Sequence, residues 1–176
     1  MRPIDTIIME VQSETPLIKT LRMDRSLDPH PGQYAMVWIR GLDEVPMSFS
    51  GPDTITVQSV GEASEALNSL GEGRSIGLRG PLGKGFTLLG ERILIIGGGV
   101  GTAPLAFLGE QAMNAGMEVT SLIGYRCCSD MIFLKRFQRL GRTIVTTDDG
   151  SSGIRGRVAA GLEALDLDDY DQIYLC

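Results

Sequence analysis

Four glycines between positions 97 and 101 have the spacing of a phosphate-binding turn. They follow an apolar segment, Ile93–Ile96, and precede Thr102, where the pattern predicts the start of a helix. Glycines let backbone N–H groups approach an anion without a Cβ in the way, and a helix N-terminus favours negative charge. A dinucleotide pyrophosphate is the usual ligand, although a purely structural glycine turn is an alternative. The candidate residues are Gly97, Gly98, Gly99, Gly101, Thr102 and Pro104.

The spacing of this turn departs from the simple Rossmann pattern. Counted from Gly99, the pattern gives Gly99-x-Gly101-x-x-Pro104, with proline in place of the third glycine. Proline is tolerated in the first turn of a helix because its missing N–H would have no partner there. A Rossmann fold also has an acidic residue after its second strand, whereas this predicted strand ends in Gly124-Tyr125-Arg126. The sequence therefore predicts a nucleotide-binding turn of another subtype.

Composition and charge exclude several classes of protein. The chain has 176 residues, of which 43% are hydrophobic and 22% charged, as in globular proteins. Its net charge of −6, without a basic cluster, argues against a nucleic-acid-binding surface. No apolar run is long enough to cross a bilayer, and the N-terminus lacks a signal-peptide pattern. We expect a cytoplasmic protein.

The residues that usually perform catalysis or bind metals are scarce. The single histidine, His30, stands in a loop rich in proline and glycine. Cys127 and Cys128 are adjacent, so they lack the spacing of a zinc site, and we expect buried or half-buried residues after a strand. The sequence therefore predicts no catalytic side chain and no metal ligand, and it favours chemistry performed by a cofactor.

The two halves of the chain show different patterns. Residues 1–88 contain short alternating or β-branched segments separated by turns, which predicts an antiparallel β-barrel interrupted by one helix. Residues 89–176 alternate between strand and helix, which predicts a Rossmann-like α/β domain with a parallel sheet. In the first half we expect strands at Ile4–Val11, Leu17–Met23, Tyr34–Ile39, Ile55–Val60 and Ser75–Arg79 and a helix at Glu62–Leu70. In the second half we expect strands at Arg92–Ile96, Glu118–Ile123, Thr143–Thr146 and Gln172–Leu175 and helices at Thr102–Ala115, Ser129–Leu140 and Gly156–Leu165.

Six short motifs follow one another in a fixed order. They are Pro31-Gly32-Gln33-Tyr34, Val45-Pro46-Met47-Ser48, Gly61-Glu62-Ala63-Ser64, Gly80-Pro81-Leu82-Gly83-Lys84-Gly85-Phe86, Gly97–Pro104 and Thr147-Asp148-Asp149-Gly150. This order, from Pro31 to Cys176, resembles the ferredoxin–NADP reductase superfamily. Within it, residues 147–156 are similar to the Thr-Asp-Asp-Gly-x-x-Gly-x-x-Gly segment of the electron-transfer subunits of NAD-dependent dihydroorotate dehydrogenases.

The resemblance implies that residues 1–88 form an FAD-binding domain. The family lays its flavin along the segment that matches Pro46, Met47 and Ser48, with a neighbouring strand that matches Thr56, Val57 and Gln58. Ala63 and Ser64 match the turn that holds the flavin pyrophosphate. Met47 as barrel filling and Ser48 as an ordinary strand or turn residue are the alternatives.

The resemblance also implies that residues 89–176 form an NAD(P)-binding domain at the glycine turn. Arg126 follows the second strand and is a candidate for an adenosine phosphate, with a solvated loop residue as the alternative. Asp148 and Asp149 follow the third strand and are candidates for ribose hydroxyls or for capping the next helix. A magnesium site from this pair of carboxylates has no other support. Cys176 would lie beside the nicotinamide.

The sequence departs from the family pattern at three places. Val45 replaces the usual arginine, which would contact a flavin phosphate, and Ala63 replaces the usual glycine. These changes predict weaker FAD binding, or binding by backbone groups alone. The family continues from Tyr-x-Cys-Gly-Pro to the cysteines of a 2Fe–2S cluster, whereas this sequence reaches Cys176 and contains none of the later cysteines. We expect a cluster only if the chain continues past Cys176.

The implied function is electron transfer between NAD(H) and a partner catalytic subunit through FAD, in a hetero-oligomeric dihydroorotate dehydrogenase of pyrimidine biosynthesis. A flavin subunit of another NAD(P)H-dependent complex, such as a sulfide dehydrogenase, a hydrogenase or a ferredoxin:NADP transhydrogenase, is an alternative. A second alternative is a nucleotide-binding subunit that has lost its flavin, which Val45 and Ala63 favour. The sequence does not distinguish NADH from NADPH or identify the electron acceptor.

Overall fold

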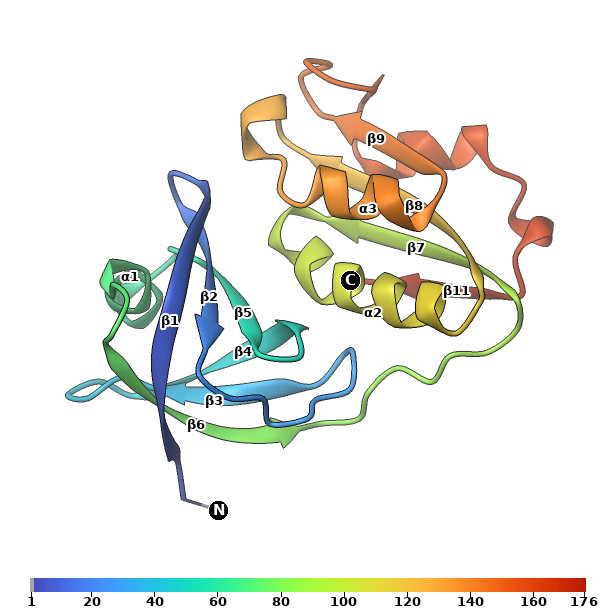
Figure 1. Ribbon diagram of the computed structural model, residues 1–176. Helices are drawn as coiled ribbons and strands as arrows, with labels where there is room; N and C mark the ends of the chain where they lie inside the picture. Colours follow the sequence, from blue (N-terminus) through green and yellow to red (C-terminus); the bar gives the residue numbers. More distant parts are fainter. Residues whose placement is uncertain (1) are drawn as a thin grey trace. The chain divides into compact units, whose positions relative to one another are not determined.

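The computed structural model describes residues 2–176 and separates them into two compact units, one ending at Phe86 and the other comprising Thr87–Cys176. The first unit is a closed antiparallel barrel with the strand order β1-β2-β5-β4-β3-β6 (Figure 1). One helix follows β5 along the chain. The elements of this unit are β1 (Ile4–Thr15), β2 (Ile18–Met23), β3 (Tyr34–Trp38), β4 (Glu44–Gly51), β5 (Thr54–Gln58), α1 (Glu62–Ser69) and β6 (Ser75–Leu82).

Side-chain alternation along the strands produces the barrel core. Ile55 of β5 pairs with Leu21 of β2 on one side and with Phe49 of β4 on the other, and none of these three side chains is exposed. Their neighbours along each strand point to the opposite face, because successive residues of a strand alternate. Each fully buried aliphatic or aromatic side chain contributes roughly 1.5–3 kcal/mol relative to its exposed form.

Strand β4 was not among the predicted strands. Its residues Glu44–Ser48 pair with β3, whereas its pairing with β5 is confined to Phe49 and Gly51. Pro46 therefore stands in the half of β4 that has a ladder partner on one side, where a residue without an N–H is tolerated. The proline obscures the strand pattern in the sequence without preventing the strand.

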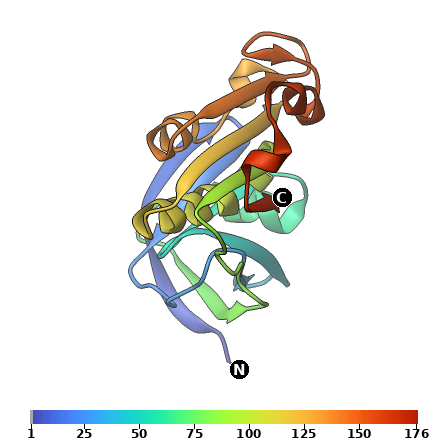
Figure 2. The ribbon, with the colours of Figure 1, turned by 90° about the vertical axis from the view of Figure 1, so that its right-hand side faces the viewer.

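The second unit is a five-stranded parallel sheet with the order β10-β9-β8-β7-β11. Helices α2 and α3 cover one face, and a 3₁₀ turn at Val158–Ala164 covers the other (Figures 1 and 2). Its strands and helices are β7 (Arg92–Gly98), α2 (Thr102–Asn114), β8 (Glu118–Tyr125), α3 (Leu134–Leu140), β9 (Thr143–Thr147), β10 (Ile154–Arg155) and β11 (Gln172–Leu175). Together with the barrel, this sheet confirms the predicted fold class.

Two predicted helices differ from those in the structure. The helix expected at Ser129–Leu140 begins only at Leu134, because Phe133 before it has a left-handed backbone with φ of 60°. The helix expected at Gly156–Leu165 is a 3₁₀ turn, Val158–Ala164. Gly161 in this turn packs against the sheet so closely that an added Cβ would lie 2.3 Å from a methyl of Leu122. Tertiary packing therefore decides both segments.

The chain enters β7 through a segment that is fastened to β11. The Tyr174 hydroxyl donates to the carbonyl of Thr87 at 2.7 Å and accepts from the N–H of Leu89 at 3.2 Å. The Asp171 carboxylate accepts from the N–H groups of Glu91 and Arg92, both at 2.8 Å. These bonds fix the start of the strand that leads to the glycine turn. Within residues 2–176, no helix is long and apolar enough to span a membrane.

Candidate functional site

The predicted nucleotide-binding residues of the second unit come from the carboxyl ends of neighbouring strands. Strands β9, β8, β7 and β11 are adjacent and parallel, so their ends meet at one edge of the sheet. Arg126 follows β8, Asp148 and Asp149 follow β9, and Cys176 follows β11, and all four are exposed. Ligands of open α/β sheets bind at this edge.

The four glycines of the turn do not have the same surroundings. A Cβ at Gly97 would lie 2.7 Å from a methyl of Leu105, and one at Gly101 would lie 3.1 Å from the backbone of Cys176. A Cβ at Gly98 would meet only the carbonyl of Gly124, at 3.9 Å, and one at Gly99 would meet nothing within 4 Å. Contacts within the chain thus leave little room for a side chain at Gly97 and Gly101, whereas Gly98 and Gly99 have open space where a Cβ would stand, although the Gly98 N–H already donates to the Cys176 carbonyl at 3.2 Å.

The open part of the turn fits an anionic ligand. Gly99 has φ of +54°, a left-handed conformation that glycine adopts without the penalty of a side chain. The N-terminus of α2 has no side-chain cap and no acidic residue in its first turn. A short 3₁₀ turn, Gly99–Gly101, precedes α2, and the Thr102 N–H donates to the carbonyls of Gly99 and Val100 in it, so a pyrophosphate can accept only from N–H groups at the beginning of that turn. The backbone here suits a dinucleotide.

Thr102 and Pro104 contribute no exposed side chain to this site. Both are buried, and the Thr102 hydroxyl donates to the Gly99 carbonyl at 2.7 Å. Tyr125, at the end of β8, reaches the same hydroxyl with its own at 3.2 Å. Sequence reasoning did not single out Tyr125, which contacts a residue of the predicted turn. Its only signal is a polar aromatic residue at the end of an apolar strand, where the Rossmann pattern has an acidic residue.

The loops after β8 and β9 are joined by hydrogen bonds. The Asp149 carboxylate accepts from the N–H of Ser151 at 2.9 Å and from its hydroxyl at 2.6 Å, and these bonds lower the pKa of Asp149. The Ser151 hydroxyl in turn accepts from the N–H of Cys128 at 2.8 Å. Asp149 therefore shapes its own turn and does not cap a helix. Cys128 is exposed, which corrects the expectation of a buried or half-buried residue, whereas Cys127 is half-buried.

The described residues contain no group of three or more His, Cys, Asp or Glu side chains arranged to hold a metal ion. The paired carboxylates Asp148 and Asp149 therefore have no further acidic ligand beside them.

The predicted flavin residues of the barrel lie on two neighbouring strands and on the helix that follows them. Ser48 pairs with Tyr34 and Met47 with Ala35, so Ser48 and Met47 point to opposite faces of the sheet. Pro46 and Ser48 are exposed, whereas Met47 is half-buried on the face of the core residue Ala35. The exposed face of β4 thus offers a proline ring and a hydroxyl.

Strand β5 turns polar side chains toward the face opposite the core. Val57 is fully buried in the barrel core, so its side chain does not reach that face, whereas Gln58 is half-buried. The Thr56 hydroxyl donates to Ser50 at 2.8 Å and lies 3.0 Å from the hydroxyl of Thr20. Thr56 is therefore committed to hydrogen bonds between strands, whereas Gln58 keeps part of its side chain exposed.

The start of α1 is capped by its own sequence. The Ser64 hydroxyl accepts from the N–H groups of Val60 at 2.9 Å and Gly61 at 3.0 Å, and it donates to the Gly61 carbonyl at 2.8 Å. Ala63 is half-buried, and the acidic residues Glu62 and Glu65 stand in the first turn. The backbone of this turn fits an anion. However, the Ser64 hydroxyl is already hydrogen-bonded within the turn, and the negative charges of Glu62 and Glu65 repel a phosphate.

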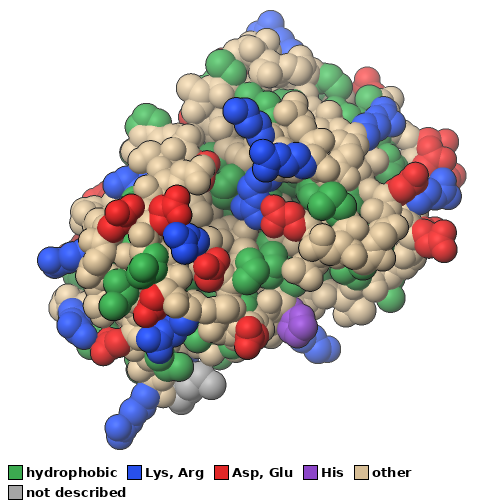
Figure 3. Space-filling view, in the orientation of Figure 1, with side chains coloured by type: hydrophobic (Ala, Val, Ile, Leu, Met, Phe, Trp, Pro, Cys, Tyr) green, Lys and Arg blue, Asp and Glu red, His purple; other side chains and the backbone are tan. Residues whose placement is uncertain are grey.

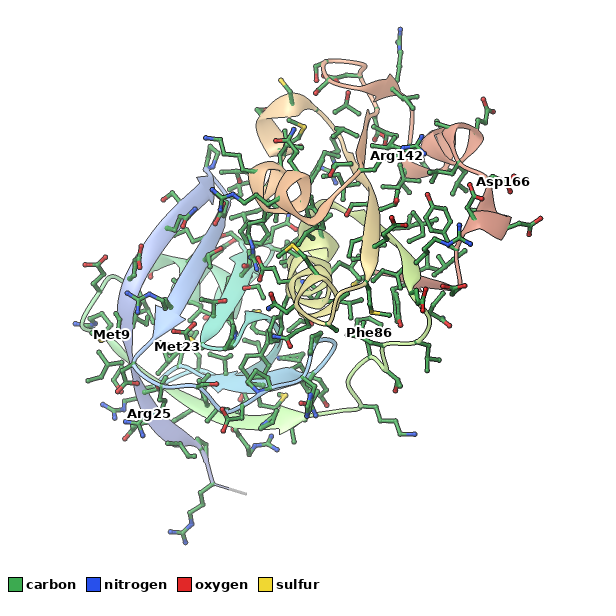
Figure 4. All side chains as sticks on the ribbon, turned by 45° about the vertical axis from the view of Figure 1, so that its right-hand side comes forward. Met9, Met23, Arg25, Phe86, Arg142 and Asp166 are labelled. Carbon is green, nitrogen blue, oxygen red and sulfur yellow. The ribbon has the colours of Figure 1, made fainter. Side chains whose placement is uncertain are left out.

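A separate hollow of about 480 Å³ lies on the barrel and includes none of the predicted site residues. Met9, Met23 and Arg25 lie around it (Figure 4). Hydrogen bonds from Arg25, then from Thr6 and the N–H of Ile7, lower the pKa of Asp24 in its wall. Basic and acidic side chains are interspersed over the face seen in Figure 3.

The barrel, the parallel sheet and the glycine turn together define the fold of the ferredoxin–NADP reductase superfamily. Two solved structures share it with TM-scores above 0.8. NADH-dependent reduced ferredoxin-NADP oxidoreductase matches with a TM-score of 0.82 and 24% identity over 91% of this chain and 62% of that one. The FAD/NAD-binding domain of nitric oxide dioxygenase from Vibrio cholerae matches with a TM-score of 0.87 and 23% identity over 100% of this chain and 87% of that one.

Sequence comparisons are more specific, although no family model matches the chain. A protein from Methanocella arvoryzae is 52% identical, over 100% of this chain and 69% of that protein. One from Methanocaldococcus jannaschii is 37% identical, over 99% of this chain and 68% of that protein. Both are named probable dihydroorotate dehydrogenase B (NAD(+)), electron transfer subunit. The chain belongs to the family of dihydroorotate dehydrogenase B electron transfer subunits, and this confirms the resemblance seen in the sequence.

Proposed function

We propose that this chain transfers electrons between NAD(H) and a catalytic dihydroorotate dehydrogenase subunit through a bound FAD. The observation that carries the proposal is the open backbone at Gly98 and Gly99, at the carboxyl edge of a parallel sheet, in a member of this family. FAD, when bound, supplies the chemistry that converts a two-electron donor into a source of single electrons. The protein supplies binding and orientation.

The roles of the residues follow from their positions. Gly98, Gly99 and the start of α2 would hold the dinucleotide pyrophosphate, with Arg126, Asp148 and Asp149 along the edge toward the adenosine and Cys176 toward the nicotinamide. In the barrel, Pro46, Ser48 and Gln58 would contact the flavin ring, and the backbone at Gly61–Ser64 its pyrophosphate. A 2Fe–2S cluster is proposed only for a chain that continues past Cys176.

The two halves of this proposal are tested by a flavin spectrum and an NADH titration. We expect the purified chain to bind FAD, to show the yellow colour of an oxidised flavin, and to be bleached by NADH under anaerobic conditions without any partner. Electron delivery is then measured by adding the catalytic subunit and its substrate. Gly98→Ala is the matched variant, since it keeps the flavin but weakens NADH-dependent bleaching.

A colourless chain that still binds NADH would favour a second function, that of a nucleotide-binding subunit without flavin. The specific observations in its favour are Val45 in place of arginine, Ala63 in place of glycine and the two acidic residues in the first turn of α1. A chain that binds neither FAD nor NADH would overturn both functions.

A further inference from the structure

The hydroxyl of Tyr125 connects the glycine turn to the loop before α3. Tyr125 is 4% exposed, and its hydroxyl donates to the carbonyl of Ile132 at 2.7 Å. It also lies 3.2 Å from the hydroxyl of Thr102, which donates to the carbonyl of Gly99 at 2.7 Å. A chain of polar contacts therefore runs from the Ile132 carbonyl through the two hydroxyls to the Gly99 carbonyl in the middle of the turn.

The direction of these hydrogen bonds is determined by their donors. The proton of Thr102 is directed to the Gly99 carbonyl, so the Thr102 oxygen faces Tyr125 as an acceptor. Burial raises the pKa of Tyr125 to about 12, so the hydroxyl keeps its proton at neutral pH. Tyr125 has a single proton, so the carbonyl of Ile132 at 2.7 Å and the hydroxyl of Thr102 at 3.2 Å share it in one three-centre hydrogen bond, whose shorter arm goes to Ile132.

The loop that contains Ile132 is itself anchored to neighbouring elements. Ile132 is buried and precedes Phe133, the residue with a left-handed backbone. The Arg136 guanidinium lies 4.5 Å from the centre of the Phe133 ring. It also donates to both carboxylate oxygens of Glu110 on α2, at 2.8 and 2.9 Å. The loop that holds Tyr125 is therefore fastened to the helix that begins at the turn.

The orientation of the Gly99 carbonyl determines where the next N–H points. A trans peptide is planar, so the N–H of Val100 points opposite to the carbonyl of Gly99. That carbonyl accepts from both the hydroxyl and the N–H of Thr102, on the protein side of the turn. The Val100 N–H is therefore directed away from Thr102.

We propose that Tyr125 is a positioning residue for the pyrophosphate of the bound dinucleotide. Acting through Thr102, it holds the Gly99 carbonyl inward and thereby presents the Val100 N–H to a phosphate oxygen. The inference rests on the proposed binding of NAD(H). It assigns to the end of β8 a second role, beside any contact that Arg126 makes with the adenosine.

The test compares Tyr125→Phe with Tyr174→Phe. Tyr174 is a control in the same unit, because it is buried and its hydroxyl also donates to a carbonyl at 2.7 Å, while its second contact at 3.2 Å is to a backbone N–H and not to the glycine turn. Equilibrium binding of NADH is followed by its fluorescence. We expect Tyr125→Phe to raise the NADH Kd about fivefold, the effect of one neutral hydrogen bond, and Tyr174→Phe to leave it unchanged.

Two further measurements separate positioning from a loss of stability. ADP-ribose contains the pyrophosphate but no nicotinamide, so its affinity should fall by the same factor in Tyr125→Phe. Thr102→Ser keeps the hydroxyl and should keep the affinity, whereas Thr102→Val should reproduce the loss. The double variant Tyr125→Phe/Thr102→Val should lose no more than Thr102→Val alone, because both substitutions break the same chain.

Unchanged NADH affinity in a folded Tyr125→Phe variant would overturn the inference, as would an equal loss in Tyr174→Phe. If Tyr125→Phe does not fold, the comparison of Thr102→Ser with Thr102→Val decides. A wild-type chain that binds neither NADH nor ADP-ribose would refute the proposed function itself, a result distinct from failure of the Tyr125 variant alone.

Discussion

Two helix N-termini in this molecule follow glycine-containing turns, and they are built differently. At α1, the Ser64 side chain accepts from the N–H groups of Val60 and Gly61, so a residue of the helix itself stabilises the turn. At α2, no side chain caps the helix, and the hydroxyl of Thr102 faces inward to Gly99. The turn at α2 therefore depends on tertiary contacts, from Tyr125 and Cys176, and leaves its outer side to a ligand.

The charges at the two turns also leave α2, and not α1, open to an anionic ligand. The first turn of α1 contains Glu62 and Glu65, which complement the helix dipole without a ligand. The first turn of α2 contains no acidic residue. An anion therefore meets a favourable, uncompensated dipole at α2 and a partly compensated one at α1. We infer that the dinucleotide turn is the stronger anion site of the two.

The largest effect on cofactor affinity is expected at the glycine turn before α2. Gly99→Val places a branched side chain at φ of +54°, which costs roughly 1–2 kcal/mol in backbone strain, and it covers the open backbone. We expect NADH affinity to fall by more than about tenfold, with FAD binding retained. Fluorescence titration with NADH and the flavin spectrum measure the two outcomes.

Gly98→Ala and Gly61→Ala are the controls for this prediction. Both glycines have extended backbones, and neither added methyl would meet an atom closer than 3.9 Å. Gly98→Ala should weaken NADH binding and Gly61→Ala should weaken FAD binding. The opposite pattern would mean that the two turns hold each other's cofactor.

Removing the Ser64 hydroxyl, which caps the start of α1, should destabilise the barrel. Ser64→Ala leaves the N–H groups of Val60 and Gly61 without their acceptor, and the loss of such a cap costs about 1 kcal/mol. Urea unfolding followed by circular dichroism measures the loss. Ser69→Ala, at the exposed other end of α1, should change stability much less, and equal losses in the two variants would contradict the capping role.

Neutralising the two acidic residues in the first turn of α1 should strengthen FAD binding at this weaker anion site. The double variant Glu62→Gln/Glu65→Gln removes two negative charges beside the expected flavin pyrophosphate, and we expect FAD to bind about threefold more tightly at low salt. Glu72→Gln, outside the helix, is the control. An affinity that does not depend on these two residues at low ionic strength would argue against a phosphate at α1.

The smallest effect, a change in stability with pH, is expected at the entry to β7, the strand that leads to the glycine turn. Hydrogen bonds from the N–H groups of Arg92 and Glu91 hold the pKa of Asp171 below its usual value of 3.8. The ionised carboxylate therefore stabilises the fold above that value and loses this contribution as the pH falls through its lowered pKa. The stability difference between wild type and Asp171→Asn should be constant near neutral pH and shrink below about pH 4. A difference that grows in acid would have the wrong sign.

The sequence was sufficient for the fold class because periodicity reports the face that each residue presents. Period-two segments predict the barrel strands, and alternating strand and helix patterns predict the parallel sheet. It was not sufficient for β4, where Pro46 breaks the pattern, or for the start of α3, which Phe133 and the bond from Tyr125 to Ile132 determine. Local composition is a weak predictor wherever a distant residue supplies the decisive contact.

The candidate site divides in the same way. The glycine turn, the strand before it and the helix after it are encoded by adjacent residues, so the sequence alone determined where a phosphate site would be. Which glycines leave room for a ligand was decided only by tertiary structure, because Leu105 packs against Gly97 and Cys176 against Gly101. The role of Tyr125 was equally hidden, since it depends on the hydroxyl of Thr102, a residue of another element. Spacing along the chain defines local backbone conformation, whereas contacts between elements determine which of its groups remain available.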